Sequence, residues 1–122
     1  MKIRMYELRE DELGALERTR AGLPRGFEVE ATPIALTPDT LDTVDGAEGV
    51  VIVTKSPLDE SMLGELAARG VRFVATRSIG FNHIDIDAAR RLGIRVCNTT
   101  YPPYGVAEFA ISMSMMANSA TP

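Results

Sequence analysis

The sequence predicts an α/β fold in which an open, parallel β-sheet carries helices on both faces. Segments with the character of strands alternate five times with segments with the character of helices, and the connections between them are short. The run Gly49–Val53 is apolar at consecutive positions, which is typical of a strand covered on both faces in a parallel sheet. Right-handed crossovers are then expected, whereas the pattern leaves the strand order open.

The first elements are predicted from alternation, charge placement and capping signals. Lys2–Tyr6 alternates and is expected as the first strand. Arg9–Ala21 is expected as a helix, because acidic residues come early and basic residues late, and Gly22 lies where a C-terminal glycine belongs. Phe27–Ala31 is the second strand. Thr37-Pro38-Asp39 starts a short helical turn, with a capping hydroxyl just before a proline at the first helical position.

The elements after the apolar strand Gly49–Val53 begin and end at similar signals. The same helix-start signal, a capping residue followed by a proline, recurs at Ser56-Pro57-Leu58-Asp59. In chain order, the later elements are a helix from this start to about Arg69 closed by Gly70, the strand Val71–Thr76, a helix from Asp85 or Ile86 to Leu92 ended by Gly93, the strand Ile94–Cys97, and a helix beginning near Gly105.

Composition is that of an ordinary globular domain and excludes several classes of partner. The 122 residues include 13 Lys+Arg and 17 Asp+Glu, a net charge of −4. The chain thus lacks the excess of positive charge with which proteins bind nucleic acid or an anionic membrane. One cysteine and one histidine exclude an internal disulfide framework and offer no metal site. No apolar run approaches the ~20 residues of a membrane span, and the start lacks the apolar region of a signal peptide. We therefore expect a cytoplasmic protein.

Candidate binding residues lie in the loops after the third, fourth and fifth strands, because ligands of open α/β sheets bind at the carboxyl ends of strands. In the second of these loops, Gly80 after Ile79 either presents consecutive backbone N–H groups to an anion or serves a tight turn. Arg77 either pairs with a ligand carboxylate or pins its own loop to a neighbouring carbonyl or acid. His83 has no paired acid and no second histidine beside it, so we expect a hydrogen-bonded structural role for it.

The loop after the fifth strand is stiffened by two prolines between Tyr101 and Tyr104. The sequence leaves open whether these phenols point toward a cleft or pack over the sheet end. Cys97 ends a strand that we expect to be buried, and is expected to be a small apolar filler.

The glycine and serine patterns of the best-known catalytic and cofactor motifs are absent from the chain. No stretch reads G-x-G-x-x-G, G-x-x-x-x-G-K or G-x-S-x-G. With one histidine and no cofactor fingerprint, we expect no catalytic residue in this chain by itself.

Two apolar stripes mark the helix expected over Val106–Ala117. One stripe follows i, i+3, i+4, i+7 and i+11 spacing, and the other lies on the opposite face, which suggests burial on both sides. One side would face the domain's own sheet, and the other is expected to drive self-association, as in a homodimer. The stripes consist of Val106, Phe109, Ala110, Met113 and Ala117 on one face and Ile111 and Met115 on the other.

Four stretches in the last third of the chain form a specific combination. They are Thr76-Arg-Ser-Ile-Gly-Phe-Asn-His-Ile-Asp85, Ala88-Ala-Arg-Arg-Leu-Gly-Ile-Arg-Val96, Tyr101-Pro-Pro, and Val106-Ala-Glu-Phe-Ala110. This combination resembles the D-2-hydroxyacid dehydrogenases, and most of all their D-lactate dehydrogenase branch with the vancomycin-resistance enzymes that reduce pyruvate to D-lactate.

The resemblance implies a fold and separate roles for two domains of the enzyme. Residues 1–104 would form a flavodoxin-like substrate-binding domain with a five-stranded parallel sheet, and residues 105–122 an interdomain hinge helix. That helix would lead into a Rossmann domain, outside this chain, that binds NAD and carries the catalytic Arg, Glu and His. The resemblance thus implies the substrate-binding portion of an NAD-dependent oxidoreductase that acts on a small 2-hydroxy or 2-oxo acid, inactive by itself.

The resemblance also implies roles for individual residues. The backbone N–H groups of Ile79 and Gly80 would hold the substrate carboxylate, and Tyr101 would contact it from the facing loop. Val53 would line the side-chain pocket, and Glu108 would approach the interdomain cleft. The alternative interpretation is a standalone flavodoxin-like binding or interaction module without catalysis.

Overall fold

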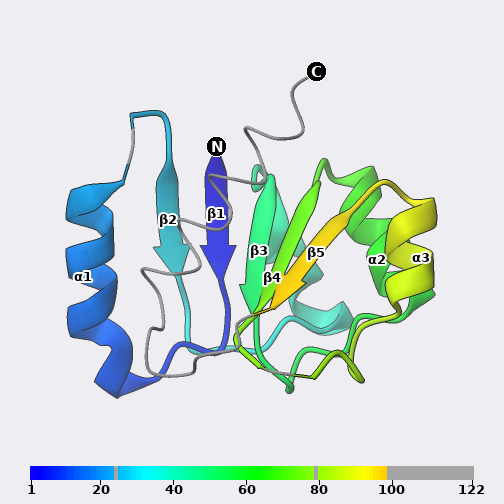
Figure 1. Cartoon of the computed structure of the whole chain (residues 1–122), viewed down its shortest axis with the longest axis horizontal. Coiled ribbons are helices and arrows are strands. Elements are labelled where there is room, and N and C mark those ends of the chain that lie inside the picture. Colours follow the sequence, from blue (N-terminus) through cyan, green and yellow to red (C-terminus); the bar gives the residue numbers. More distant parts are fainter. Residues whose placement is uncertain (24, 79, 99–122) are drawn as a thin grey trace.

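The computed structural model of the chain describes residues 1–23, 25–78 and 80–98, and its centre is a five-stranded sheet (Figure 1). All pairings are parallel, and the strand order is β2-β1-β3-β4-β5. This confirms the open parallel sheet, and the order is that of flavodoxin-like folds. The strands are β1 (Lys2–Met5), β2 (Glu28–Ala31), β3 (Gly49–Ile52), β4 (Phe73–Thr76) and β5 (Arg95–Asn98).

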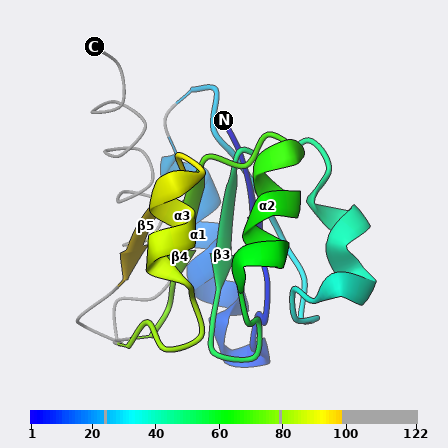
Figure 2. The ribbon, with the colours of Figure 1, turned by 90° about the vertical axis from the view of Figure 1, so that its right-hand side faces the viewer.

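Helices cover both faces of this sheet, as expected. Figure 2 shows α2 (Glu60–Ala68) and α3 (Ile86–Arg91) in front of the sheet and α1 (Leu13–Gly22) behind it. Two short 3₁₀ segments, Glu10–Glu12 and Pro38–Val44, complete the described elements. The helix expected over Val106–Ala117 lies outside the described residues. No helix in the described part of the chain is long and apolar enough to span a bilayer.

The capping predictions are confirmed in part. Thr37 begins the 3₁₀ segment at Pro38, and its N–H donates to Thr40 Oγ1 at 2.9 Å. Gly70 ends α2 and Gly93 ends α3 in left-handed conformations, with φ of +93° and +77°, which glycine adopts without steric cost.

Two details of the expected helices are wrong. Asp59, rather than Ser56, caps α2, because its Oδ1 accepts the N–H of Met62 at 2.9 Å, whereas the Ser56 hydroxyl is buried and bonded elsewhere. The first helix opens as a 3₁₀ turn, and Gly22 is the last residue of α1 rather than a left-handed residue beyond it.

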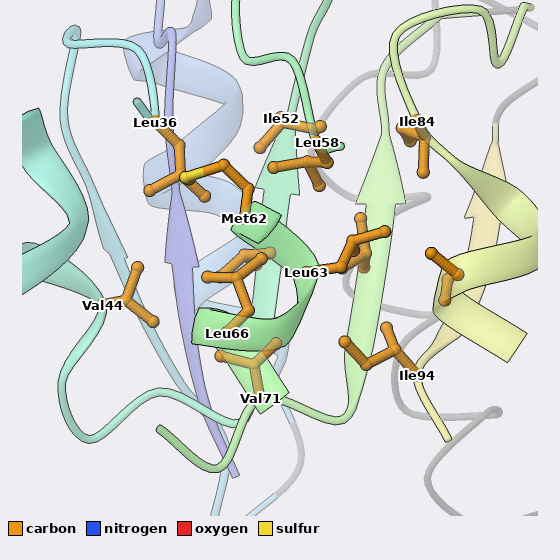
Figure 3. Packing of buried hydrophobic residues seen from close by; sticks show 14 of the residues in the cluster. Leu36, Val44, Ile52, Leu58, Met62, Leu63, Leu66, Val71, Ile84 and Ile94 are labelled. Atoms are coloured by element: carbon orange, nitrogen blue, oxygen red, sulfur yellow. The ribbon is translucent and has the colours of Figure 1, made fainter. Parts of the chain in front are cut away.

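The core has two layers, one on each face of the sheet. Strand β3 contributes to both, since Val50 and Ile52 pack on the α2 and α3 side while Val51 packs on the α1 side. Its four residues are all buried, which explains the consecutive apolar run. Figure 3 shows the larger layer, where side chains of α2 meet those of the sheet and the loops. Its labelled members are Leu36, Val44, Ile52, Leu58, Met62, Leu63, Leu66, Val71, Ile84 and Ile94.

Candidate functional site at the carboxyl edge of the sheet

The carboxyl ends of β3, β4 and β5 meet at one edge of the sheet. Ile52 pairs with Thr76, and Thr76 pairs with Asn98, so the three loops singled out from the sequence start side by side. The strand order reverses its direction between β1 and β3, and such a switch point is where open α/β sheets bind ligands. The loop after β1 therefore also belongs to the candidate site.

Gly80 is the open part of the turn after β4. It is exposed, and a Cβ added at its position would meet no atom of the described residues within 4 Å. No acceptor among the described residues bonds its N–H, whereas its carbonyl accepts the Ser78 hydroxyl at 2.9 Å. The turn is thus held from within by the Ser78 hydroxyl, while Gly80 itself is exposed. Ile79 lies outside the described residues.

Arg77 is built into the base of the same turn. Its side chain is only 8% exposed, and its Nη1 pairs with the Glu12 carboxylate. Its Nη2 donates to the carbonyls of Tyr6 at 3.2 Å and Glu7 at 2.8 Å. Burial lowers the pKa of the Arg77 guanidinium, an effect that the charge of nearby Arg9 reinforces. Of the two roles considered from the sequence, the structure shows Arg77 bonded to neighbouring carbonyls and an acid, which fixes its own loop. A role of Arg77 in substrate binding stays a prediction.

Glu7 is a site residue that the sequence reasoning missed. It lies two residues after the end of β1. Its carboxylate accepts the N–H of Val53 at 2.7 Å, the N–H of Lys55 at 3.0 Å and the hydroxyl of Ser56 at 2.7 Å. No motif marks it. The usable signal was its position directly after the first predicted strand, but only the strand order shows that this loop adjoins the loop after β3.

Val53 is half-buried at the start of the loop after β3. Its N–H donates to Glu7 and its carbonyl accepts the N–H of Ser56 at 3.3 Å, and neither contact tests its expected role in lining a substrate pocket. That role stays a prediction, as do those of Tyr101 and Glu108, which lie outside the described residues.

His83 is hydrogen bonded within the fold, in agreement with its expected structural role. Its Nε2 lies 2.9 Å from Thr76 Oγ1, which lies 2.7 Å from the Ser78 hydroxyl. Burial lowers the pKa of the imidazole, and the charge of Glu7 opposes this shift only in part. His83 is therefore neutral at pH 7. Among the described residues, no group of three metal-ligating side chains is close enough to hold an ion.

Cys97 is a half-buried thiol in β5 that packs against the apolar layer on the α1 side, as expected for a small filler. The expectation that it ends a buried strand is wrong, because β5 continues to Asn98 and its residues are exposed or half-buried. Burial raises its pKa to about 11. Because the thiolate is the reactive form of cysteine, this environment makes Cys97 a poor nucleophile.

A cavity of about 300 Å³ lies between α3 and β5. None of the described residues predicted for the site lines it, and its walls are mostly apolar. The lining residues are Phe81, Ile86, Ala89, Arg90, Ile94 and Val96.

Comparisons with known proteins point to one family. The family described as "D-isomer specific 2-hydroxyacid dehydrogenase, catalytic domain" matches residues 3–121. D-lactate dehydrogenase of Escherichia coli strain K12 is 36% identical over 119 residues, which are 97% of this chain and 36% of that protein. The chain therefore spans about a third of the length of this relative.

Solved structures give the same result. The apo-structure of D-lactate dehydrogenase from Escherichia coli is similar with a TM-score of 0.76 and 36% identity, over 94% of this chain and 36% of that chain. The NAD-complexed D-isomer specific 2-hydroxyacid dehydrogenase from Lactobacillus delbrueckii ssp. bulgaricus is similar with a TM-score of 0.73 and 28% identity, over 94% and 35%.

Proposed function

Since this chain belongs to the D-isomer-specific 2-hydroxyacid dehydrogenase family, we propose that it forms the substrate-binding portion of an NAD-dependent enzyme that interconverts a small D-2-hydroxy acid and its 2-oxo acid. The single observation that carries this proposal is the family match over residues 3–121. Pyruvate is the proposed 2-oxo acid, because D-lactate dehydrogenases are among the similar proteins.

The substrate carboxylate is proposed to bind at the turn after β4. Gly80 is exposed, a Cβ added to it would meet no atom of the described residues within 4 Å, and its N–H has no described acceptor, which supports this proposal. Successive backbone N–H groups form a concave site for an anion, and Ile79 would supply the second group. Tyr101 would contact the same carboxylate from the loop after β5, and Val53 would line the pocket for the substrate's side chain.

NAD is the proposed cofactor of the whole enzyme, because a solved structure of a family member holds it. The described residues of this chain do not fit a dinucleotide. The loop after β1, where dinucleotide-binding domains carry a glycine-rich phosphate loop, contains no glycine and is followed by the acidic residues Glu10, Asp11 and Glu12. Their negative charges would repel a pyrophosphate, so no role toward the cofactor is assigned to these residues, and Glu108 is only proposed to lie near the interdomain cleft.

The domain organisation is proposed to follow the family, with residues 1–104 as the substrate-binding domain and residues 105–122 as a hinge helix. The two apolar stripes of Val106–Ala117 support self-association of the chain as a homodimer. Sedimentation velocity should detect a dimer at micromolar concentration. A monomer at high micromolar concentration with this helix folded would contradict the dimer. The cytoplasmic location stays a prediction that cell fractionation can test.

Titration with a substrate analogue tests the proposed function. Oxamate, an unreactive analogue of pyruvate, should shift the backbone ¹⁵N–¹H signal of Gly80 saturably, whereas signals of the exposed side of α1 should stay in place. The isolated chain should show no turnover with NADH and pyruvate. If neither oxamate nor pyruvate shifts the Gly80 signal, the proposed substrate site is overturned. The standalone binding module is then the better interpretation.

A further inference from the structure

Glu7 has an uncommon backbone conformation at the switch point of the sheet. Its φ is +58°, and it is the one non-glycine residue with a positive φ among the residues that the structure describes. A side chain with a Cβ is disfavoured in this region, and such residues persist only where their surroundings fix them. The contacts of Glu7 must therefore hold its backbone in this conformation.

The side chain of Glu7 is bound on both carboxylate oxygens. Oε2 accepts the N–H of Val53 and the hydroxyl of Ser56, each at 2.7 Å, and Oε1 accepts the N–H of Lys55 at 3.0 Å. The Ser56 hydroxyl also accepts the N–H of Leu36 at 2.9 Å, which directs its own proton toward Glu7. Hydrogen bonds to a charged acceptor are stronger than neutral ones, so this carboxylate fixes the backbone of the loop after β3.

The backbone of Glu7 is bound as firmly as its side chain. Its N–H donates to the carbonyl of Ile34 at 2.8 Å, and its carbonyl accepts Arg77 Nη2 at 2.8 Å. Arg77 lies three positions before Gly80 and is also paired with Glu12. One residue of the β1 loop therefore contacts both the loop that contains Val53 and the base of the turn that contains Gly80.

We propose that Glu7 is a positioning residue for the substrate site, a role that rests on the proposed function. Its carboxylate holds the loop of Val53, and its carbonyl anchors Arg77 beneath the turn of Gly80. The relative position of the proposed pocket wall and the proposed carboxylate site is then set by a third loop that does not itself touch the substrate. The three donors also spread the negative charge of Glu7, which would otherwise oppose an anionic substrate nearby.

Two substitutions distinguish the contribution of the Glu7 carboxylate from that of its strained backbone. Glu7→Gln keeps the size of the side chain and removes its charge. Glu7→Gly removes the side chain and relieves the positive φ, so it should fold. The matched control is Glu28→Gln, an exposed position on β2 with the same change in net charge and no side-chain hydrogen bond in the described structure. Dispersed amide spectra of all three variants verify the fold.

The first readout is the pair of amide signals of Val53 and Lys55. Both should move upfield in Glu7→Gln and Glu7→Gly and stay in place in Glu28→Gln, because a charged acceptor is lost only in the first two. Sodium formate, a carboxylate that fits the vacated space, should shift these two signals back saturably in Glu7→Gly and in no other variant. If the two signals match those of the control in both Glu7 variants, the proposed role is overturned.

The second readout is the affinity for oxamate at Gly80, without formate. We expect the apparent Kd to rise about tenfold in both Glu7 variants and to stay unchanged in the control, the loss expected when one charge-assisted contact no longer positions the site. An unchanged Kd in the Glu7 variants, with a normal response of the wild type, would overturn the positioning role alone. No response of the wild type would overturn the proposed function, and the positioning role with it.

Discussion

The apolar layer beneath α2 and the buried polar side chains at the carboxyl edge of the sheet are held in place by different interactions. Leu63 and Leu66 are fully buried among other hydrocarbon side chains, where the free energy depends on buried area and not on direction. At the edge, the buried Ser56, Thr76 and Arg77 each have directed polar partners. The apolar layer therefore tolerates repacking, whereas the carboxyl edge requires particular atoms at particular positions.

Removing the guanidinium of Arg77 should have the largest effect on stability. Arg77→Met keeps most of the side-chain length but removes the buried partner of the Glu12 carboxylate, leaving it only the exposed Arg9 at 3.6 Å, and leaves two carbonyls without this donor. We expect the free energy of unfolding in urea to fall by about 3–5 kcal/mol. Arg91→Met, at an arginine that is 60% exposed and paired with the exposed Glu60, should change it by less than about 0.5 kcal/mol. Equal losses in both variants would break the comparison.

Truncating a side chain in the apolar layer should have a slightly smaller effect. Leu63→Ala leaves a cavity under α2 and should lower the free energy of unfolding by about 2–5 kcal/mol. The matched control is Leu13→Ala in α1, where the leucine is 49% exposed. Denaturation curves of the two variants compare them directly, and a Leu63→Ala loss no larger than that of the control would show that the layer is loosely packed.

The pH dependence of stability should include a contribution from the half-buried imidazole of His83 at the edge. Burial lowers the pKa of His83 below 6.5 in the folded chain, so the unfolded chain takes up a proton first as the pH falls. The free energy of unfolding should therefore decrease from pH 6.5 down to the folded pKa and change little through this group above pH 6.5. His83→Gln should lose this part of the slope in urea titrations. The same slope in the variant would assign it to other groups.

The thiol of Cys97 should give the smallest effect, one on reactivity without a change in stability. Because burial raises its pKa to about 11 from the ordinary value of 9.0, the thiolate fraction at pH 8 falls about a hundredfold. Ellman's reagent should react about a hundredfold more slowly with the folded chain than with the chain in urea. Similar rates in the two states would place the thiol at the surface.

The sequence alone was sufficient to predict the secondary-structure elements of the described residues and to indicate the family. Alternation, capping residues and glycines depend on a few neighbouring residues, so the five strands, the start at Thr37 and the ends at Gly70 and Gly93 could be predicted. The motif that begins at Thr76 was specific enough to indicate the family that the comparisons then identified. The same local rules chose Ser56 as a cap, and there they were wrong.

The tertiary structure alone decided the partners at the carboxyl edge. Glu7 reaches Val53 across 46 positions, and Arg77 reaches Glu12 across 65. Such pairs form because the order β2-β1-β3-β4-β5 places the loop after β1 beside the loops after β3 and β4, and hydrophobic periodicity carries no information on strand order. The positive φ of Glu7 follows from those distant contacts, since nothing in its own neighbourhood favours it.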